Sequence, residues 1–409
     1  MEMFISKKLK QSSICSSSWV QATFLIVAFF LYSCGSDSEP DPVENKTLIS
    51  ATEIASYPVQ LLQFGANQQG FSAISGQLQY DITIYKIEYL TTYLGTEITA
   101  SGLIGVPNTE EEVPTLSFQH GTIAAHADAP TESDEGTFYA SFASLGYISL
   151  IPDFIGFGSS SDFLHPYYHA ESTAECIIDM VRAAEEFIAE KNLNSNGKLF
   201  LAGYSEGGYA TMVTHKRIEE KYENEFNLVA SAPASGGYDL VGMKDYFIEL
   251  ESYSQPFYLA YLALSYTDVY EWPTLLSDLF NEPYASTISE LFDGSKSGSQ
   301  INASLTTDIK QLLTEDFRTN SNDSKYDLLN QTLETNSPIS WQPKHPIFMY
   351  HCSADITVPY QNSQNTYNHL IDAGADESKV TFTTIDGATH NTGVAPFVID
   401  FLSVFSDLK

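Results

Sequence analysis

A serine between two glycines, at the junction of an apolar run and a helical segment, constrains the fold of this chain more than any other feature. Gly203, Ser205 and Gly207 fit the pattern G-x-S-x-G within LFLAGYSEGGYA. The pattern requires a sharp turn from strand to helix, which strains the backbone of the serine and exposes its hydroxyl. Side chains at the two glycines would collide with neighbouring backbone. The sequence thus predicts a reactive serine, provided that a base and a carboxylate accompany it.

Extended and helical patterns alternate along the chain from about residue 81. Residues 81–94 and 97–107 are rich in β-branched and aromatic residues, so we expect two antiparallel strands there. Residues 172–192 predict a helix that begins with a capping box of Ser172 and Glu175. Short runs that we expect to form strands of a parallel sheet lie at 115–121, 147–154, 198–205, 226–235, 345–355 and 379–386. The pattern predicts an α/β fold with a mostly parallel, doubly wound sheet.

One segment, from about 241 to 340, contains no strand of the sheet core. A loop of this length without structure is uncommon inside a domain, so a helical subdomain is expected. Its first third, DYFIELESYSQPFYLAYLALSYTDVYEW, is dense in aromatic residues and leucine. We expect a lid over the carboxyl edge of the sheet, where open α/β folds bind ligands. The lid would divide the core into a first part at 48–240 and a second part at 341–409.

The N-terminus has the features of an export signal. A basic start is followed by the apolar run VQATFLIVAFFLYS, which is shorter than the ~20 residues of a membrane span. The sequence LYSC, which ends at Cys34, resembles a bacterial lipoprotein signal, in which the cysteine becomes the acylated first residue. We therefore predict a signal peptide over 1–33, a lipid anchor at Cys34 and a disordered acidic tether over 34–47.

The anchor sets the expected location. A lipidated Cys34 would place the protein in the bacterial cell envelope, as an outer-membrane lipoprotein that faces the periplasm or the exterior. An ordinary cleaved signal, which would give a secreted protein, and a short membrane anchor are the alternatives.

Charge and cysteine content narrow the possible partners. The chain has 19 Lys and Arg against 52 Asp and Glu, a formal net charge of −33. No nucleic-acid partner is expected for so acidic a protein. Cys176, in a predicted helix, and Cys352, at a strand end, are expected to be free and buried, although one pair could form. No CxxC, HExxH or EF-hand spacing occurs, so neither a metal site nor a cofactor is predicted.

An activated serine needs a histidine base and usually a carboxylate that orients the base. In the predicted fold these partners follow the serine in the order acid, then histidine, each in a loop after a late strand. Asp355 in PIFMYHCSADITVPY and His390 in VTFTTIDGATHNTG occupy those places. Asp386 is a rival acid only four residues before His390, but the acid normally follows the preceding strand. Asp153 also ends a strand, but because it precedes the serine we expect it to fix a Gly-rich loop.

The remaining histidines are given structural roles. His120 is expected to form structural hydrogen bonds rather than to act as a second base. Six others are expected to be surface or packing residues: His126, His165, His169, His215, His345 and His351.

A developing oxyanion needs hydrogen-bond donors. One donor is expected to be the backbone N–H of Glu206, at the start of the helix after the serine. The other should come from the loop in SFQHGT, where Gly121 permits close approach of the backbone and the N–H of Thr122 is the candidate.

These motifs together carry a family resemblance. GYSEGG at 203–208, HGT at 120–122, PDFIGFG at 152–158 and DITVP at 355–359 are similar to the α/β-hydrolase superfamily. Within it they resemble the secretory lipase branch, which is related to fungal lipase A, over roughly residues 80–405. The resemblance implies a helical lid between the sixth and seventh core strands. It also implies hydrolysis of carboxylic esters through an acyl-enzyme, with Ser205 as nucleophile, His390 as base and Asp355 as orienting acid.

Other functions remain open at this point. The expected substrate is a small-molecule or lipid ester, bound by a monomer. A carbohydrate-ester hydrolase, acting on acetyl or feruloyl esters, would use the same three residues. A peptidase of the prolyl-oligopeptidase type shares their order but normally carries an N-terminal propeller, and no propeller repeat precedes the domain here. A non-catalytic surface binding protein could keep the fold and use the pocket for a ligand.

Overall fold

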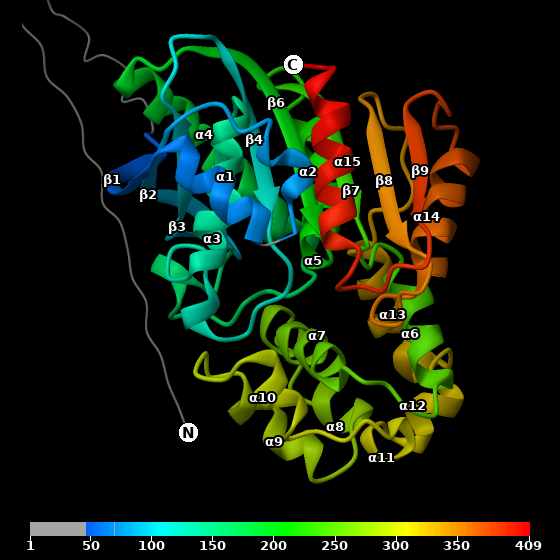
Figure 1. The fold of residues 1–409 in the computed structure, drawn as a ribbon. Helices are drawn as coiled ribbons and strands as arrows, with labels where there is room; N and C mark the ends of the chain where they lie inside the picture. The colour runs from blue at the N-terminus through cyan, green and yellow to red at the C-terminus, as the bar shows by residue number, and fades with distance from the viewer. Residues whose placement is uncertain (1–45, 69) are drawn as a thin grey trace, which may run out of the picture. The chain divides into compact units, whose positions relative to one another are not determined.

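In the computed structural model, which describes residues 46–68 and 70–409, nine strands form one sheet (Figure 1). Their order across the sheet is β1-β2-β3-β5-β4-β6-β7-β8-β9. The strands are β1 Leu48–Tyr57, β2 Ile82–Tyr93, β3 Thr96–Pro107, β4 Val113–Gln119, β5 Ile148–Pro152, β6 Ser195–Tyr204, β7 Asn227–Ala234, β8 Ile347–Cys352 and β9 Val380–Ile385. The α/β class and the mostly parallel sheet expected from the sequence are confirmed.

The mode of strand pairing changes once across the sheet, from antiparallel to parallel. Strands β1, β2 and β3 pair antiparallel with their neighbours, and β3 also pairs antiparallel with β5. From β5 to β9 all neighbours are parallel. Strand β1 was not predicted, because its sequence LISATEIASY mixes polar and apolar residues without a clear alternation and half of its positions are exposed.

Helices cover both faces of the sheet, because side chains of a buried strand point alternately to either face. In β6, Phe200 and Ala202 belong to one hydrophobic cluster, whereas Leu199 and Leu201 belong to another. The first cluster packs against α1 Val59–Gln68, α2 Ser72–Ser75, α3 Asp134–Ala140 and α15 Val394–Ser406. The opposite face is covered by α4 Ala170–Lys191, α5 Glu206–Lys221 and α14 Tyr360–Asp372.

Helix α4 begins two residues before the predicted capping box, so that prediction was wrong. His169 is the N-cap residue, and its Nδ1 lies 3.4 Å from the N–H of Ser172 and 2.8 Å from the Ser172 hydroxyl. The N–H of Ala170 donates to Oδ1 of Asn336 at 2.9 Å. A residue from another part of the chain therefore supplies a cap that local sequence cannot show.

Eight helices between β7 and β8 form the lid, within the residues that the structure describes. They lie beyond the carboxyl ends of the strands (Figure 1) and share a hydrophobic cluster with Tyr167, Tyr168 and Tyr209 of the core. The helices are α6 Leu240–Glu249, α7 Pro256–Val269, α8 Leu275–Leu279, α9 Tyr284–Leu291, α10 Gly298–Asn302, α11 Ile309–Leu312, α12 Glu315–Asn320 and α13 Asp327–Thr335. None of the helices in the described part of the chain has the length and hydropathy that a bilayer crossing requires.

Asn336 fixes the point where the chain leaves the lid. Its side-chain oxygen caps Ala170, and its side-chain N–H donates to the hydroxyl of Tyr270 at 2.8 Å. Its backbone carbonyl accepts from the hydroxyl of Tyr209 at 2.8 Å. Tyr209 lies on α5 and Tyr270 follows α7. The lid is therefore tied by hydrogen bonds to the helix that begins beside Ser205.

Candidate active site

Ser205 lies in the turn between β6 and α5, with φ 60° and ψ −125°. This is a left-handed backbone conformation that a side chain rarely adopts, as the G-x-S-x-G pattern requires. A Cβ at Gly203 would overlap the carbonyl oxygen of Gly207, and a Cβ at Gly207 would overlap the carbonyl oxygen of Gln119. The expected strain and close backbone approach are both present.

His390 lies in the segment between β9 and α15 and faces the serine. Its Nε2 is 3.0 Å from Oγ of Ser205, and its Nδ1 is 2.6 Å from Oδ2 of Asp355. The rival acid Asp386 is exposed and has no hydrogen bond to His390 among those of the described residues. The structure therefore brings together the three residues that the chain order predicted.

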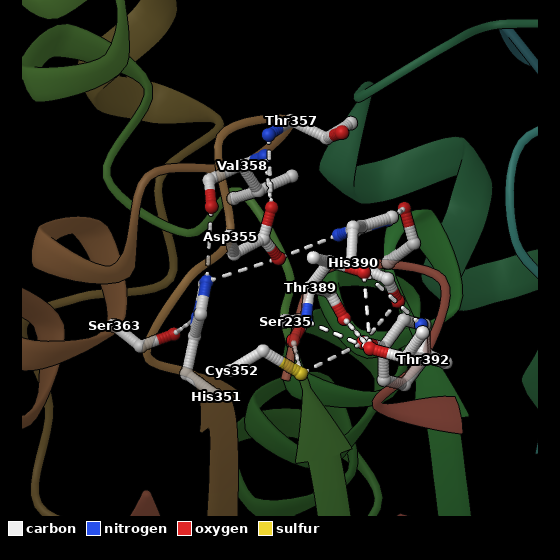
Figure 2. Close-up of polar contacts among 12 residues, drawn as sticks. Ser235, His351, Cys352, Asp355, Thr357, Val358, Ser363, Thr389, His390 and Thr392 are labelled. Atoms are coloured by element: carbon white, nitrogen blue, oxygen red, sulfur yellow. Dashed lines mark hydrogen bonds and ion pairs between the residues drawn. The ribbon is translucent and has the colours of Figure 1, made fainter. Parts of the chain in front are cut away.

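Asp355 follows β8, and its side chain is completely buried. Its Oδ1 accepts the N–H groups of Thr357 and Val358 at 2.9 and 3.0 Å, which leaves Oδ2 to His390 (Figure 2). Burial alone would raise the pKa of Asp355, but hydrogen bonds and charge interactions with His351 and His390 outweigh it and lower that pKa to about 2. The carboxylate is therefore ionised at neutral pH.

A second histidine, which sequence reasoning assigned to packing, contacts the same carboxylate. Nε2 of His351 lies 3.4 Å from Oδ2 of Asp355 and 3.0 Å from the carbonyl oxygen of Val358 (Figure 2). Its Nδ1 lies 2.6 Å from the hydroxyl of Ser363 on α14. His351 stands four residues before Asp355 in sequence, and that spacing was the only local signal of the contact.

Tyr204 holds the loop that carries His390. Its hydroxyl donates to the backbone carbonyl of His390 at 2.6 Å and lies 3.3 Å from Sγ of Cys352. Cys352 and Cys176 are both free and buried, as expected. Burial raises the pKa of both thiols.

The expected oxyanion donors lie beside the serine. Glu206 is the first residue of α5, and among the described residues neither its N–H nor that of Thr122 has a hydrogen-bond acceptor. A Cβ at Gly121 would lie 3.7 Å from Cβ of Ser205, an ordinary contact. Glycine at this position is therefore not required by crowding within the protein, and it leaves space beside the serine.

His120 has the structural hydrogen bonds expected of it, whereas the carboxylate of Asp153 bonds to β3 and to Thr131 rather than to the Gly-rich loop. Nδ1 and Nε2 of His120 lie 2.7 and 3.3 Å from the carbonyl oxygens of Gly121 and Asp153. The buried carboxylate of Asp153 accepts hydrogen bonds from Ser101 and from the backbone and side chain of Thr131. Burial raises the pKa of Asp153.

The side chain of Glu206 has a partner that the sequence did not indicate. Its Oε1 lies 2.6 Å from Nε2 of His165, both side chains are 3% exposed, and Nδ1 of His165 lies 2.7 Å from the carbonyl oxygen of Ile155. The two residues are 41 positions apart, so no local spacing in the sequence predicts the contact. The pair links the first turn of α5 to the segment after β5.

Two cavities meet at Tyr258 of α7. The first, of ≈ 190 Å³, contains Ser205 and His390 and has polar groups on its walls, including Asp128 and Glu135. The second, of ≈ 90 Å³, lies among lid helices and is lined almost entirely by apolar and aromatic side chains. Tyr258 lines both.

This arrangement supports nucleophilic chemistry on an acyl group. A neutral imidazole can accept the serine proton while the buried carboxylate stabilises the resulting imidazolium. Two free N–H groups beside the serine can stabilise a negative oxygen.

Comparisons with known proteins agree with the geometry. The model of the family described as Secretory lipase matches residues 130–396, about two thirds of the chain. A Legionella pneumophila protein assigned as a hydrolase has a TM-score of 0.81 and 27% identity, with 88% of this chain and 98% of that chain covered. No curated protein sequence matches the chain.

Two further solved structures are similar. The rice cell wall degrading esterase LipA from Xanthomonas oryzae has a TM-score of 0.78 and 26% identity, with 88% of this chain and 97% of that chain covered. Candida antarctica lipase A has a TM-score of 0.61 and 18% identity, with 89% and 82% covered, a similarity that concerns the fold alone.

Proposed function

This chain belongs to the secretory lipase family and is a carboxylic ester hydrolase, and from that premise we propose that it acts through an acyl-enzyme formed on Ser205. The observation that carries the proposal is the continuous chain of hydrogen bonds from Ser205 through His390 to Asp355. The family of secretory lipases indicates a secreted or extracellular protein.

In the first half of the reaction, Oγ of Ser205 attacks the ester carbonyl while Nε2 of His390 accepts the serine proton. The new C–O bond places a negative charge on the carbonyl oxygen, and the N–H groups of Glu206 and Thr122 stabilise that charge. His390 then gives its proton to the leaving alcohol as the ester C–O bond breaks. Asp355 stays ionised throughout and stabilises the imidazolium.

In the second half, a water molecule attacks the acyl carbonyl and gives a proton to His390. Collapse of the tetrahedral intermediate returns the proton to Oγ of Ser205 and releases the carboxylic acid. The chemistry needs no group beyond side chains, backbone N–H groups and water.

The walls of the two cavities favour an ester with an apolar acyl part. The lid cavity is lined by groups such as Phe247, Leu279 and Phe317, and it adjoins the cavity of Ser205 at Tyr258. Apolar acyl groups gain free energy by leaving water for such a surface. Asp128 and Glu135 on the wall of the Ser205 cavity disfavour an anionic leaving group.

A carbohydrate-ester hydrolase is the second candidate. Asp128, Ser133 and Glu135 give the Ser205 cavity hydrogen-bonding groups that suit a hydroxyl-rich alcohol. The similarity to an esterase described as degrading rice cell wall supports the same idea.

Hydrolysis of p-nitrophenyl esters from acetate to palmitate separates the two candidates, with Ser205→Ala assayed alongside. A maximum at long chains supports a lipase whose lid cavity holds the acyl chain. A steep fall beyond butyrate contradicts it and directs attention to acetylated or feruloylated sugars. Covalent labelling of the wild-type chain by an organophosphonate, lost in Ser205→Ala, tests the nucleophile itself and excludes a binding protein without activity.

Cys34, the signal peptide at 1–33 and most of the tether at 34–47 lie outside the described residues. Lipidation of Cys34 is therefore kept as a proposal. The anchor would hold the hydrolase at the outer membrane. Replacing Cys34 with Ala should move the protein from the membrane fraction to the soluble fraction. Unchanged fractionation would end this part of the proposal.

A further inference from the structure

A cluster of two histidines and one glutamate lies away from the proposed active site, on the second half of α5. His215 and Glu219 stand four residues apart on that helix, and His345 belongs to the segment that leads from the lid into β8. One nitrogen of each imidazole and one oxygen of the carboxylate lie within 4.8 Å of one another. The side chains of His215 and Glu219 are 0% and 2% exposed, whereas that of His345 is 32% exposed.

The carboxylate oxygen in this cluster has more nitrogen neighbours than hydrogen bonding explains. Oε1 of Glu219 accepts the backbone N–H groups of Lys344 at 2.7 Å and His345 at 2.8 Å. Nε2 of His215 and Nδ1 of His345 lie 2.9 and 3.0 Å from the same oxygen. A carboxylate oxygen offers two lone-pair sites, and two obligatory backbone donors occupy them. The two imidazole nitrogens are therefore in excess. Among the described residues, Oε2 of Glu219 accepts a hydrogen bond only from Nε1 of Trp341, so it keeps a lone pair for an ion.

A cation bound by both imidazole lone pairs and by the carboxylate accounts for this excess. We propose that His215, Glu219 and His345 form a binding site for a divalent transition-metal ion, with zinc as the favoured ion. Zinc bonds to imidazole and carboxylate atoms measure about 2.0–2.2 Å, so neighbouring ligand atoms of a tetrahedral site lie about 3.3–3.6 Å apart. The imidazole nitrogens lie 2.9 and 3.0 Å from Oε1 of Glu219, so a shift of a few tenths of an ångström would bring the three groups to these separations.

The surroundings of the three groups suit ligands of a metal ion. Oγ of Ser231 lies 2.7 Å from Nδ1 of His215, so a proton on Nδ1 leaves the lone pair of Nε2 free for a metal. Nε1 of Trp341 donates to Oε2 of Glu219 at 3.2 Å. The partly exposed His345 leaves one side open to solvent.

The ion would serve stability and not ester chemistry. His215 lies ten residues beyond Ser205 on the same helix, a distance of about 15 Å at the rise of an α-helix. A metal ion would join α5 to residues 341–345, where the chain returns from the lid to the sheet.

The test uses the full chain, freed of metal by a chelator and then titrated with ZnCl₂. Calorimetry should give one zinc ion per chain, and thermal unfolding should shift upward by several degrees at saturating zinc. His345→Gln should weaken zinc binding at least tenfold, because it removes the most exposed and least structurally constrained ligand. Ser231→Ala should weaken binding about 10–100-fold through the orientation of His215. His369→Gln, at an exposed histidine of α14, is the matched control and should bind as the wild type does.

Three outcomes would overturn the proposal. The wild-type chain could show neither bound zinc nor a shift in unfolding temperature. His345→Gln could bind zinc as tightly as the wild type. Mg²⁺ or Ca²⁺ could produce the same shift, which would assign the effect to the acidic surface rather than to these imidazoles. In each case Glu219 would be a hydrogen-bonded anchor for residues 344–345 and nothing more.

Discussion

Two chains of hydrogen bonds, each made of a serine, a histidine and a carboxylate, lie near the two ends of α5. Near its start, Ser205, His390 and Asp355 are linked at 3.0 and 2.6 Å. In its second half, Ser231, His215 and Glu219 are linked at 2.7 and 2.9 Å. Only the first serine has strained backbone and opens onto a cavity, since Ser231 is completely buried within β7.

The difference shows that the sequence of contacts among serine, histidine and acid does not by itself make a nucleophile. In Asp355, one carboxylate oxygen accepts backbone N–H groups and the other contacts the imidazole. In Glu219, a single carboxylate oxygen receives both the backbone N–H groups and the imidazole. Access to a cavity, free oxyanion donors and the division of acceptors between two carboxylate oxygens are what set the Ser205 end apart.

The largest expected effect is loss of activity in Ser205→Ala. Turnover should fall by about 10⁴–10⁶-fold, because no other group supplies the nucleophile, while the unfolding temperature stays near that of the wild type. Ser231→Ala is the matched control and should retain wild-type kcat/KM. Comparable losses in the two variants would show that the difference between the two serines is not the one described here.

Asp355→Asn should reduce kcat by about 10⁴-fold, because an amide cannot stabilise the imidazolium and favours the wrong tautomer of His390. Steady-state rates with a soluble p-nitrophenyl ester measure the effect. The same change should leave organophosphonate labelling detectable but slow. A loss below tenfold would indicate that His351 or another group orients His390.

Glu219→Gln should act on stability and not on turnover. Removal of the charge leaves histidines and backbone N–H groups poorly paired in a buried place, a cost of about 3–5 kcal/mol in the free energy of unfolding. Urea unfolding measures this cost, and kcat per folded molecule should match that of the wild type. A large fall in kcat would connect the two ends of α5 functionally.

Acid should reduce the contributions of Asp355 and Glu219 to the free energy of unfolding in the same range of pH. The folded pKa values of Asp355 and Glu219 are about 2, below the ordinary values of 3.8 and 4.5. The unfolded chain therefore binds more protons in this range, so each carboxylate contributes fully above pH about 5 and loses its contribution as the pH falls toward 2. The loss is about 2–3 kcal/mol for each carboxylate. Urea unfolding between pH 6 and 3 should show a shallower decline in Asp355→Asn and in Glu219→Gln.

The smallest expected effect belongs to His351. His351→Gln keeps a hydrogen-bonding side chain but removes the imidazole beside Asp355, so kcat should fall about tenfold while KM is unchanged. The pKa of Asp355 should rise as well, because the carboxyl loses one of the two imidazoles that favour its charged form. A change confined to the unfolding temperature would assign His351 to packing.

Much of this architecture was predictable because its rules are local or follow chain order. The glycines around Ser205 specify the turn, and the order of late strands indicates which acid and which histidine meet it. The buried strands β4 to β9 are readable from their short apolar runs. Lipidation at Cys34 and the boundary of the signal peptide stay predictions, since they lie outside the described residues.

What sequence reasoning missed depends on contacts between distant residues. His169 caps α4 together with Asn336, which is 166 positions beyond Ala170. His215 and Glu219 show helical spacing, but His345 joins them from a segment 126 positions beyond Glu219. Asn336 and His345 lie near the point where the lid ends, so their contacts exist only after the inserted helices have folded and returned the chain to the sheet.

Tyr258 has a consequence for how this enzyme could diversify. One half-buried ring on a lid helix borders both the cavity of Ser205 and the apolar cavity of the lid. A single nucleotide change at its codon could merge the two compartments or seal them, without altering any strand of the sheet or any group that handles the proton. We therefore expect substitutions at position 258 to change substrate range while the groups that handle the proton stay in place, and a library at this position would test that separation.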